Sequence, residues 1–139
     1  MNPQLVYAAH PITSYGTPHE RRAFRRLRSL LPGTTVIDPA TRYRTPWEWE
    51  ADWPSLVGEL TGLVVFAAED GIVGAGCLRE LADAVALRVP IAVLRDEGLH
   101  ELTSLQLLPA TRRTPARAAT LQVGAPVHAG FATLEAARR

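Results

Sequence analysis

The stretch 63-LVVFAAEDGIVGAGCLRELADAVALRVPIAVL-94 decides the fold. It opens with the apolar run Leu63–Ala68 and closes with Pro90–Leu94, and both runs have the length and composition of buried strands. Between them, Gly74–Arg88 carries leucine, valine and alanine at helical spacing. A strand, a helix and a second strand at this length predict a βαβ unit, and therefore a parallel sheet with right-handed crossovers.

The same alternation extends toward the N-terminus. Leu5–Ala9 is a short apolar run, and Thr34–Ile37 is a β-branched run. The segment between them begins a helix at Thr17-Pro18-His19-Glu20, since threonine caps, proline suits the first turn and Glu20 completes a capping box. The chain is therefore expected to be α/β: a small doubly wound (Rossmann/flavodoxin-like) parallel sheet of about five strands with helices on both faces.

The pattern is weaker elsewhere. Residues 39–54 hold all three tryptophans and are expected to form a long loop of the kind that often carries function. Leu102–Leu108 fits either a strand or a short helix. Ala116–Val123 is expected to be a final strand, and Thr133–Arg139 a C-terminal helical turn.

Composition narrows the class of protein. The 139 residues are 47% hydrophobic and 21% charged, which is typical of a single globular domain spanning 1–139 rather than a disordered or fibrous chain. A formal charge of +1 gives no general attraction to nucleic acid or membrane surfaces. No targeting or membrane-spanning segment is recognisable, so a cytoplasmic protein is expected. Every basic residue is arginine, which excludes Schiff-base chemistry on lysine.

Metal, disulfide and cysteine chemistry are not expected. The single cysteine, Cys77, cannot form an internal disulfide, and it is read as a space-filling residue rather than a nucleophile. The four histidines show no ligand spacing. No metal and no organic cofactor are therefore expected.

The loop 10-HPITSYGT-17 is the first candidate for a binding site. Ligands of open parallel sheets bind beyond the carboxyl ends of the strands, and this loop leads from such an end into a helix N-terminus, which favours an anion such as phosphate. An ordinary capped loop is the alternative. The candidate substrate-binding residues here are Pro11, Ile12, Thr13, Ser14, Tyr15 and Gly16.

The turn 74-GAGCLRE-80 is the second candidate. Glycines such as Gly74 and Gly76 allow a ligand to approach the backbone closely. Glu80, one turn into the following helix, is placed to act as a nucleophilic carboxylate. The alternative is a common first-turn acid that offsets the helix dipole.

Three stretches together resemble a known family. LVYAAHPI at 5–12, GCLRELADA at 76–84 and the strand Pro90–Leu94 are similar, in order and spacing, to the nucleoside 2-deoxyribosyltransferase-like superfamily, including its nucleoside 5′-monophosphate N-glycosidase branch. The likeness covers about residues 4–95. It implies cleavage or transfer of an N-glycosidic bond through a glycosyl-enzyme intermediate, in a homodimer or higher homo-oligomer.

The resemblance also implies roles for particular residues. Glu80 matches the nucleophile, Tyr7 matches the residue that orients it or contacts the sugar, and Asp38 is assigned to assist the leaving base. The first loop is implied to hold a 5′-phosphate. The family's acid six residues before the nucleophile is replaced by Gly74, with Asp70 among the nearest acids.

His10 and the tryptophans leave alternatives open. His10 stands where the family has glycine, and it fits a general acid/base, a phosphate ligand or a structural strand-end residue. The three tryptophans, Trp47, Trp49 and Trp53, are suited to stack on a nucleobase, or alternatively to anchor the loop or a subunit interface. The expected partner is a small-molecule nucleoside or nucleotide.

Two other functions compete with the glycosidase. One is a non-catalytic nucleotide-binding or sensing module that uses the same cleft, which the absence of an acid at Gly74 would suit. The other is a phosphoribohydrolase of the lysine-decarboxylase-like type, ranked last because its longer glycine-rich signature is absent.

Overall fold

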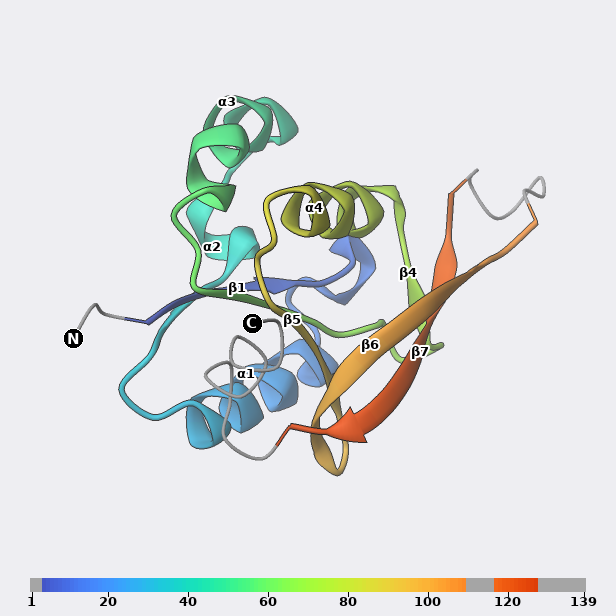
Figure 1. Ribbon diagram of the computed structural model, residues 1–139. Helices are drawn as coiled ribbons and strands as arrows, with labels where there is room; N and C mark the ends of the chain where they lie inside the picture. The colour runs from blue at the N-terminus through green and yellow to red at the C-terminus, as the bar shows by residue number, and fades with distance from the viewer. Residues whose placement is uncertain (1–3, 110–116, 128–139) are drawn as a thin grey trace.

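A computed structural model describes residues 4–109 and 117–127 (Figure 1). This part of the chain is α/β, as predicted, with seven strands and four α-helices. The elements are β1 (Leu5–Ala9), the 3₁₀ turn η1 (Ile12–Ser14), α1 (Pro18–Leu30), β2 (Thr35–Ile37), α2 (Pro39–Arg42), α3 (Pro46–Val57), β3 (Gly62–Val65), β4 (Ile72–Val73), α4 (Ala75–Ala86), β5 (Ile91–Arg95), β6 (Gly98–Leu107) and β7 (Ala119–Pro126).

The strands form one mixed sheet in the order β2-β1-β3-β5-β6-β7-β4. The first four are parallel, and the remaining pairings are antiparallel. The prediction of about five parallel strands is therefore wrong. Only Asp96 and Glu97 separate β5 from β6, with Gly98 at a φ of 132°. A connection this short cannot cross over the sheet, so β6 must return antiparallel.

Helices cover both faces of the sheet, as predicted (Figure 1). Alternate side chains of β1 explain how: Val6 and Ala8 pack against Phe24 and Leu27 of α1, whereas Tyr7 packs in the core shared with α3 and α4. Residues three apart on a strand point to opposite faces, so the two sides of the sheet can build two different polar sites at its edge.

The segment 39–54 is largely helical, which corrects the prediction of a long loop. Thr45 caps α3 by accepting the Glu48 amide, and Pro46 occupies the first turn. This is the same Thr-Pro-x-Glu arrangement that starts α1 at Thr17. The helix start was therefore visible in the sequence.

Two of the three C-terminal predictions concern described residues. Leu102–Leu108 was predicted as a strand or a short helix, and β6 confirms the strand. The strand predicted at Ala116–Val123 is confirmed by β7. The predicted helical turn at Thr133–Arg139 lies outside the described residues.

Within residues 4–109 and 117–127, no helix has the length and apolar character that spanning a bilayer requires.

Candidate functional site

Glu80 is the centre of the first site. Its side chain is buried in α4, with only 5% of the residue exposed. One carboxylate oxygen, Oε2, accepts hydrogen bonds from the Tyr7 hydroxyl of β1 and from the Trp49 indole N–H of α3, the latter at 3.0 Å. The fold thus brings together three residues that are distant in sequence, of which Glu80 and Tyr7 had been linked only through the family resemblance.

The other oxygen of Glu80, Oε1, has no partner among the described residues. Since no fully buried polar side-chain atom in this part of the chain lacks a hydrogen bond, Oε1 must face accessible space. The carboxylate is therefore fixed through one oxygen and available through the other, which is the arrangement a nucleophile needs.

The environment of Glu80 is tuned by opposing effects. Burial raises the pKa of Glu80 to about 7, because a low-dielectric surrounding disfavours the charged form. The hydrogen bonds from Tyr7 and Trp49 act in the other direction, and the charge of Asp83 adds to the rise. Burial and the neighbouring Glu80 charge also raise the pKa of Tyr7 above its usual range, so its hydroxyl stays protonated and donates.

Two tryptophans join α3 to α4. Trp49 is half-buried and donates to Glu80, and Trp53 is fully buried and donates to the Asp83 carboxylate at 2.8 Å. The two rings stack 6.5 Å apart, and the Arg79 guanidinium lies 4.9 Å from the centre of the Trp49 ring. Trp53 is thus a core anchor, Trp49 a contact of the site, and Trp47, at 72% exposure, a surface residue.

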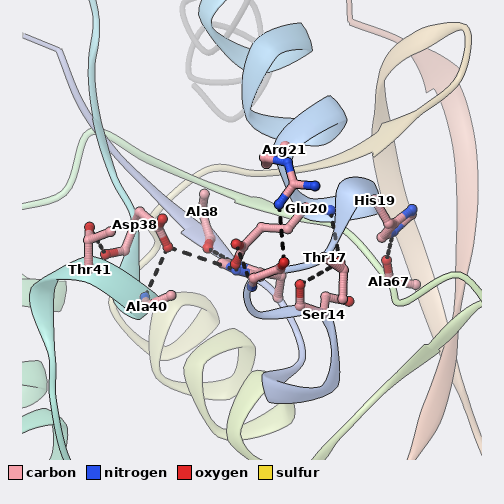
Figure 2. Close-up of polar contacts among 12 residues, drawn as sticks. Ala8, Ser14, Thr17, His19, Glu20, Arg21, Asp38, Ala40, Thr41 and Ala67 are labelled. Atoms are coloured by element: carbon pink, nitrogen blue, oxygen red, sulfur yellow. Dashed lines mark hydrogen bonds and ion pairs between the residues drawn. The ribbon is translucent and has the colours of Figure 1, made fainter.

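His10, Glu20 and Asp38 form a second cluster, on the α1 side of the sheet. His10 Nε2 lies 2.6 Å from Glu20 Oε2 and 3.8 Å from Asp38 Oδ1, while Nδ1 lies 2.8 Å from the Ala8 carbonyl oxygen. Figure 2 shows Glu20 and Asp38 approaching this position from α1 and from the start of α2. His10 stacks on Phe66 at 4.6 Å.

The two clusters are separate. No hydrogen bond or ion pair between described residues joins Asp38 or His10 to Glu80. Asp38 caps α2 by accepting the Ala40 amide at 2.9 Å, and burial raises its pKa. The assignment of Asp38 and His10 to catalysis beside Glu80 stays a prediction.

Tyr15 lies between the clusters. Its ring packs 4.9 Å from His10, and burial together with the negative charge of Glu80 raises the pKa of its phenol. Its hydroxyl has no hydrogen-bond partner among the residues described. Tyr15 is therefore a neutral donor free to meet a ligand.

The rest of the first loop is occupied by its own contacts. The Gly16 amide donates to Glu20 Oε1 at 3.0 Å, the Thr17 hydroxyl donates to the Ser14 carbonyl, and Arg21 donates to the Gly16 carbonyl (Figure 2). Pro11 and Ser14 are buried, while Ile12 and Thr13 are exposed. The Glu20 side chain thus occupies the loop amide where a phosphate was expected. Sequence reasoning had seen Glu20 only as a capping residue.

The second loop is open at its two glycines. Gly74 caps α4 and Gly76 lies in its first turn, and a Cβ added to either would meet no atom within 4 Å. Asp70 is exposed instead, and its carboxylate accepts the Ile72 amide at 3.0 Å in the turn before β4. Burial raises the pKa of the Cys77 thiol, which keeps it protonated and unreactive.

A cleft of about 550 Å³ opens at the ends of β3 and β5, on the α1 side. Its lining includes His19, Arg22, Arg26, Phe66 and Arg95, with Glu69 and Glu97 among the acids. The Arg22 and Glu69 side chains approach to 3.8 Å. Glu80, Tyr7 and Trp49 do not line this cleft, so it belongs to a different part of the surface.

Comparisons with known proteins add no relative: no protein-family model, no curated protein and no solved structure matches the chain.

Proposed function

We propose that the protein cleaves or transfers the N-glycosidic bond of a nucleoside or nucleoside 5′-monophosphate through a glycosyl-enzyme intermediate on Glu80. The observation that carries this proposal is the asymmetry of the Glu80 carboxylate, with Oε2 held by Tyr7 and Trp49 and Oε1 open. The position of Glu80 on α4, the helix that Gly74 caps, and the resemblance of the surrounding motifs to a glycosyl-transferring family support it.

The chemistry follows from that geometry. Oε1 attacks C1′ of the sugar, the C1′–N bond breaks, and its electron pair leaves with the base. The positive charge that develops on the sugar lies beside the carboxylate, which stabilises it. Water or a second base then attacks C1′ and releases Glu80. In hydrolysis, the hydroxyl of water ends on the sugar and its proton on the base.

Tyr7 and Trp49 act as positioning residues in this scheme. Their hydrogen bonds fix the rotation of the carboxylate, so that Oε1 is presented in one direction. They also partly offset the desolvation that would otherwise leave Glu80 protonated and unreactive. Tyr15, with its free hydroxyl, is the residue best placed to contact the bound substrate.

The arrangement of Glu20 bears on the choice of substrate. A 5′-phosphate at the first loop would have to displace the Glu20 carboxylate from the Gly16 amide. The nucleoside therefore comes first among the substrates to be tested, and the monophosphate second.

A non-catalytic nucleotide-binding module is the second candidate. The observation that favours it is that Gly74 stands where the family has an acid, while the nearby Asp70 is exposed and accepts the Ile72 amide in its own turn. Such a protein would bind nucleoside or nucleotide tightly and release no base.

Base release from a panel of nucleosides and nucleoside 5′-monophosphates, followed by chromatography with and without an acceptor base, tests the proposal. Glu80→Ala should abolish release while the protein stays folded by circular dichroism. Glu59→Gln, at an exposed glutamate after α3, is the control and should behave as wild type. Turnover retained in Glu80→Ala, or binding without turnover in the wild type, would overturn it.

A further inference from the structure

The cluster of His10, Glu20 and Asp38 is independent of Glu80 and needs its own account. It joins the end of β1, the first turn of α1 and the residue that caps α2. The His10 side chain is fully buried, and the Glu20 and Asp38 side chains are 11% and 20% exposed. Burying two acids beside one imidazole costs desolvation free energy unless their charges are balanced.

The hydrogen bonds restrict where the His10 protons can be. The Ala8 carbonyl oxygen only accepts, so Nδ1, at 2.8 Å from it, carries a proton. In the neutral imidazole, Nε2 then presents a lone pair toward the Glu20 and Asp38 carboxylates. A proton, carried by Nε2 or by a carboxyl group, or a cation must therefore lie between Nε2 and the carboxylate oxygens.

A backbone carbonyl on one nitrogen and carboxylates around the other is the usual setting of a metal-binding histidine. The Nδ1–H bond fixes the tautomer and the direction of the ring, and Nε2 is the ligand. One nitrogen and two carboxylate oxygens, all lying within 4.8 Å of one another, are available in this cluster. Ligands about 2 Å from one ion stand roughly 3 to 3.5 Å apart, between the observed 2.6 and 3.8 Å separations.

Charge balance favours the same occupant. The cluster holds two carboxylates and one imidazole, and among the described residues no arginine forms an ion pair with either acid. A divalent cation with a neutral His10 and the same carboxylates gives a net charge of zero. A buried cluster is most stable when its charges cancel.

The geometry points to a divalent-cation site formed by His10 Nε2, Glu20 and Asp38, with Zn²⁺ or a similar first-row transition metal as the bound ion. One imidazole nitrogen with two carboxylate oxygens suits such ions, whereas Mg²⁺ prefers oxygen ligands in octahedral geometry. Three protein ligands leave at least one position open, and the Tyr15 ring packs 4.9 Å from the His10 ring. The spacing of histidines along the sequence could not reveal this site, because two of the ligands are acids on other elements.

Calorimetric titration of the metal-free full chain with Zn²⁺, and in parallel with Mg²⁺, tests the site. The wild type should bind one Zn²⁺ and show no comparable heat with Mg²⁺. Asp38→Asn and Glu20→Gln should each weaken Zn²⁺ binding by at least about tenfold. Both variants keep an acceptor for the Ala40 and Gly16 amides, so both should fold, as circular dichroism will check.

Matched controls locate the binding. Asp70→Asn removes an exposed turn aspartate, and His100→Gln removes a histidine outside the cluster; both should bind Zn²⁺ as the wild type does. Absence of Zn²⁺ binding would overturn the inference and leave a hydrogen bond between His10 and Glu20. Binding that survives unchanged in Asp38→Asn and Glu20→Gln would overturn it as well. Neither result bears on turnover at Glu80.

Discussion

Glu80 makes the stability of the fold depend on pH. Burial raises its pKa from 4.5 to about 7, so between these values the folded protein holds a proton that the unfolded chain releases. The resulting stabilisation is complete below pH 4.5, is lost as the pH rises toward 7, and amounts to about 3 kcal/mol. The side chain that replaces the carboxylate in Glu80→Gln cannot ionise. The unfolding free energy of Glu80→Gln minus that of the wild type should therefore increase by about 3 kcal/mol from pH 4.5 to pH 8.

Urea unfolding of both proteins at pH 4.5 and at pH 8 measures this difference. Glu59→Gln is the control, because Glu59 is exposed and its replacement should change stability equally at both pH values. A constant difference between Glu80→Gln and the wild type would show that the carboxylate ionises freely in the folded protein.

The donors to Glu80 should set the pH dependence of turnover. Both hydrogen bonds favour the ionised carboxylate, so removing either raises the pKa of Glu80. If Glu80 is the nucleophile, turnover falls as the pH drops below about 7. In Tyr7→Phe and Trp49→Phe this fall should begin about one pH unit higher, the equivalent of roughly 1.4 kcal/mol.

The pH–rate profile of base release is the measurement. Tyr43→Phe is the matched control, since the Tyr43 hydroxyl donates to Asp52 at 2.6 Å and not to Glu80. If turnover falls at the same pH in the wild type, Tyr7→Phe and Trp49→Phe, then the ionisation that limits turnover at low pH is not that of Glu80.

At the scale of elements, α3 delivers Trp49 to the site, so its N-terminal cap should matter for function. Thr45 accepts the Glu48 amide at 3.2 Å, and Thr45→Ala should cost about 1 kcal/mol of unfolding free energy. Loosening the first turn also frees the Trp49 indole, so base release should fall together with stability. Thr45→Ser keeps the hydrogen-bond acceptor and should restore both stability and base release. An unaltered rate of base release in Thr45→Ala would mean that the contacts with Trp53 and Arg79, and not the helix cap, hold Trp49 in position.

The elements also show which local signals suffice. Thr17-Pro18 and Thr45-Pro46 start helices in the same way, yet only the first lies among apolar residues at clear helical spacing. Tryptophans and charges on most faces of α3 obscure its inner side, which the fold defines through Trp53 and Asp83. Caps identify where a helix begins, but the partner it packs against decides which face is buried.

At the scale of the whole molecule, features with a local sequence pattern could be predicted, whereas features that depend on contacts between distant residues could not. The βαβ pattern predicted the parallel strands β3 and β5 correctly because α4 leaves a periodic trace of apolar residues in the sequence, whereas α3, between β2 and β3, does not. The antiparallel half leaves no such trace, and its pairing depends on the short turn after Arg95. The site followed the same rule: Glu80 was found through a local motif, whereas Trp49 and Glu20 acquire their roles only through tertiary contacts.

That antiparallel half leaves an open strand edge. Residues 98–101 of β6 pair with β5, but residues 102–107 pair only with β7 among the described strands. Leu105 and Leu107, which are 38% and 67% exposed, lie on this stretch. A long strand with an unpaired edge and apolar side chains is a template for pairing with another chain. We therefore predict that the homodimer or higher homo-oligomer implied by the family resemblance forms through this edge.

Sedimentation velocity over a range of protein concentrations tests the interface. Leu107→Lys places a charge on the open edge and should raise the dimer dissociation constant by about tenfold or more. Leu87→Lys, at a comparably exposed leucine that follows α4, is the control and should sediment as the wild type. A wild type that remains monomeric, or a Leu107→Lys dimer of unchanged affinity, would remove β6 from any role in assembly. Because Glu80 lies between α3 and the sheet rather than on this edge, monomeric Leu107→Lys should keep its hydrogen bonds to Tyr7 and Trp49.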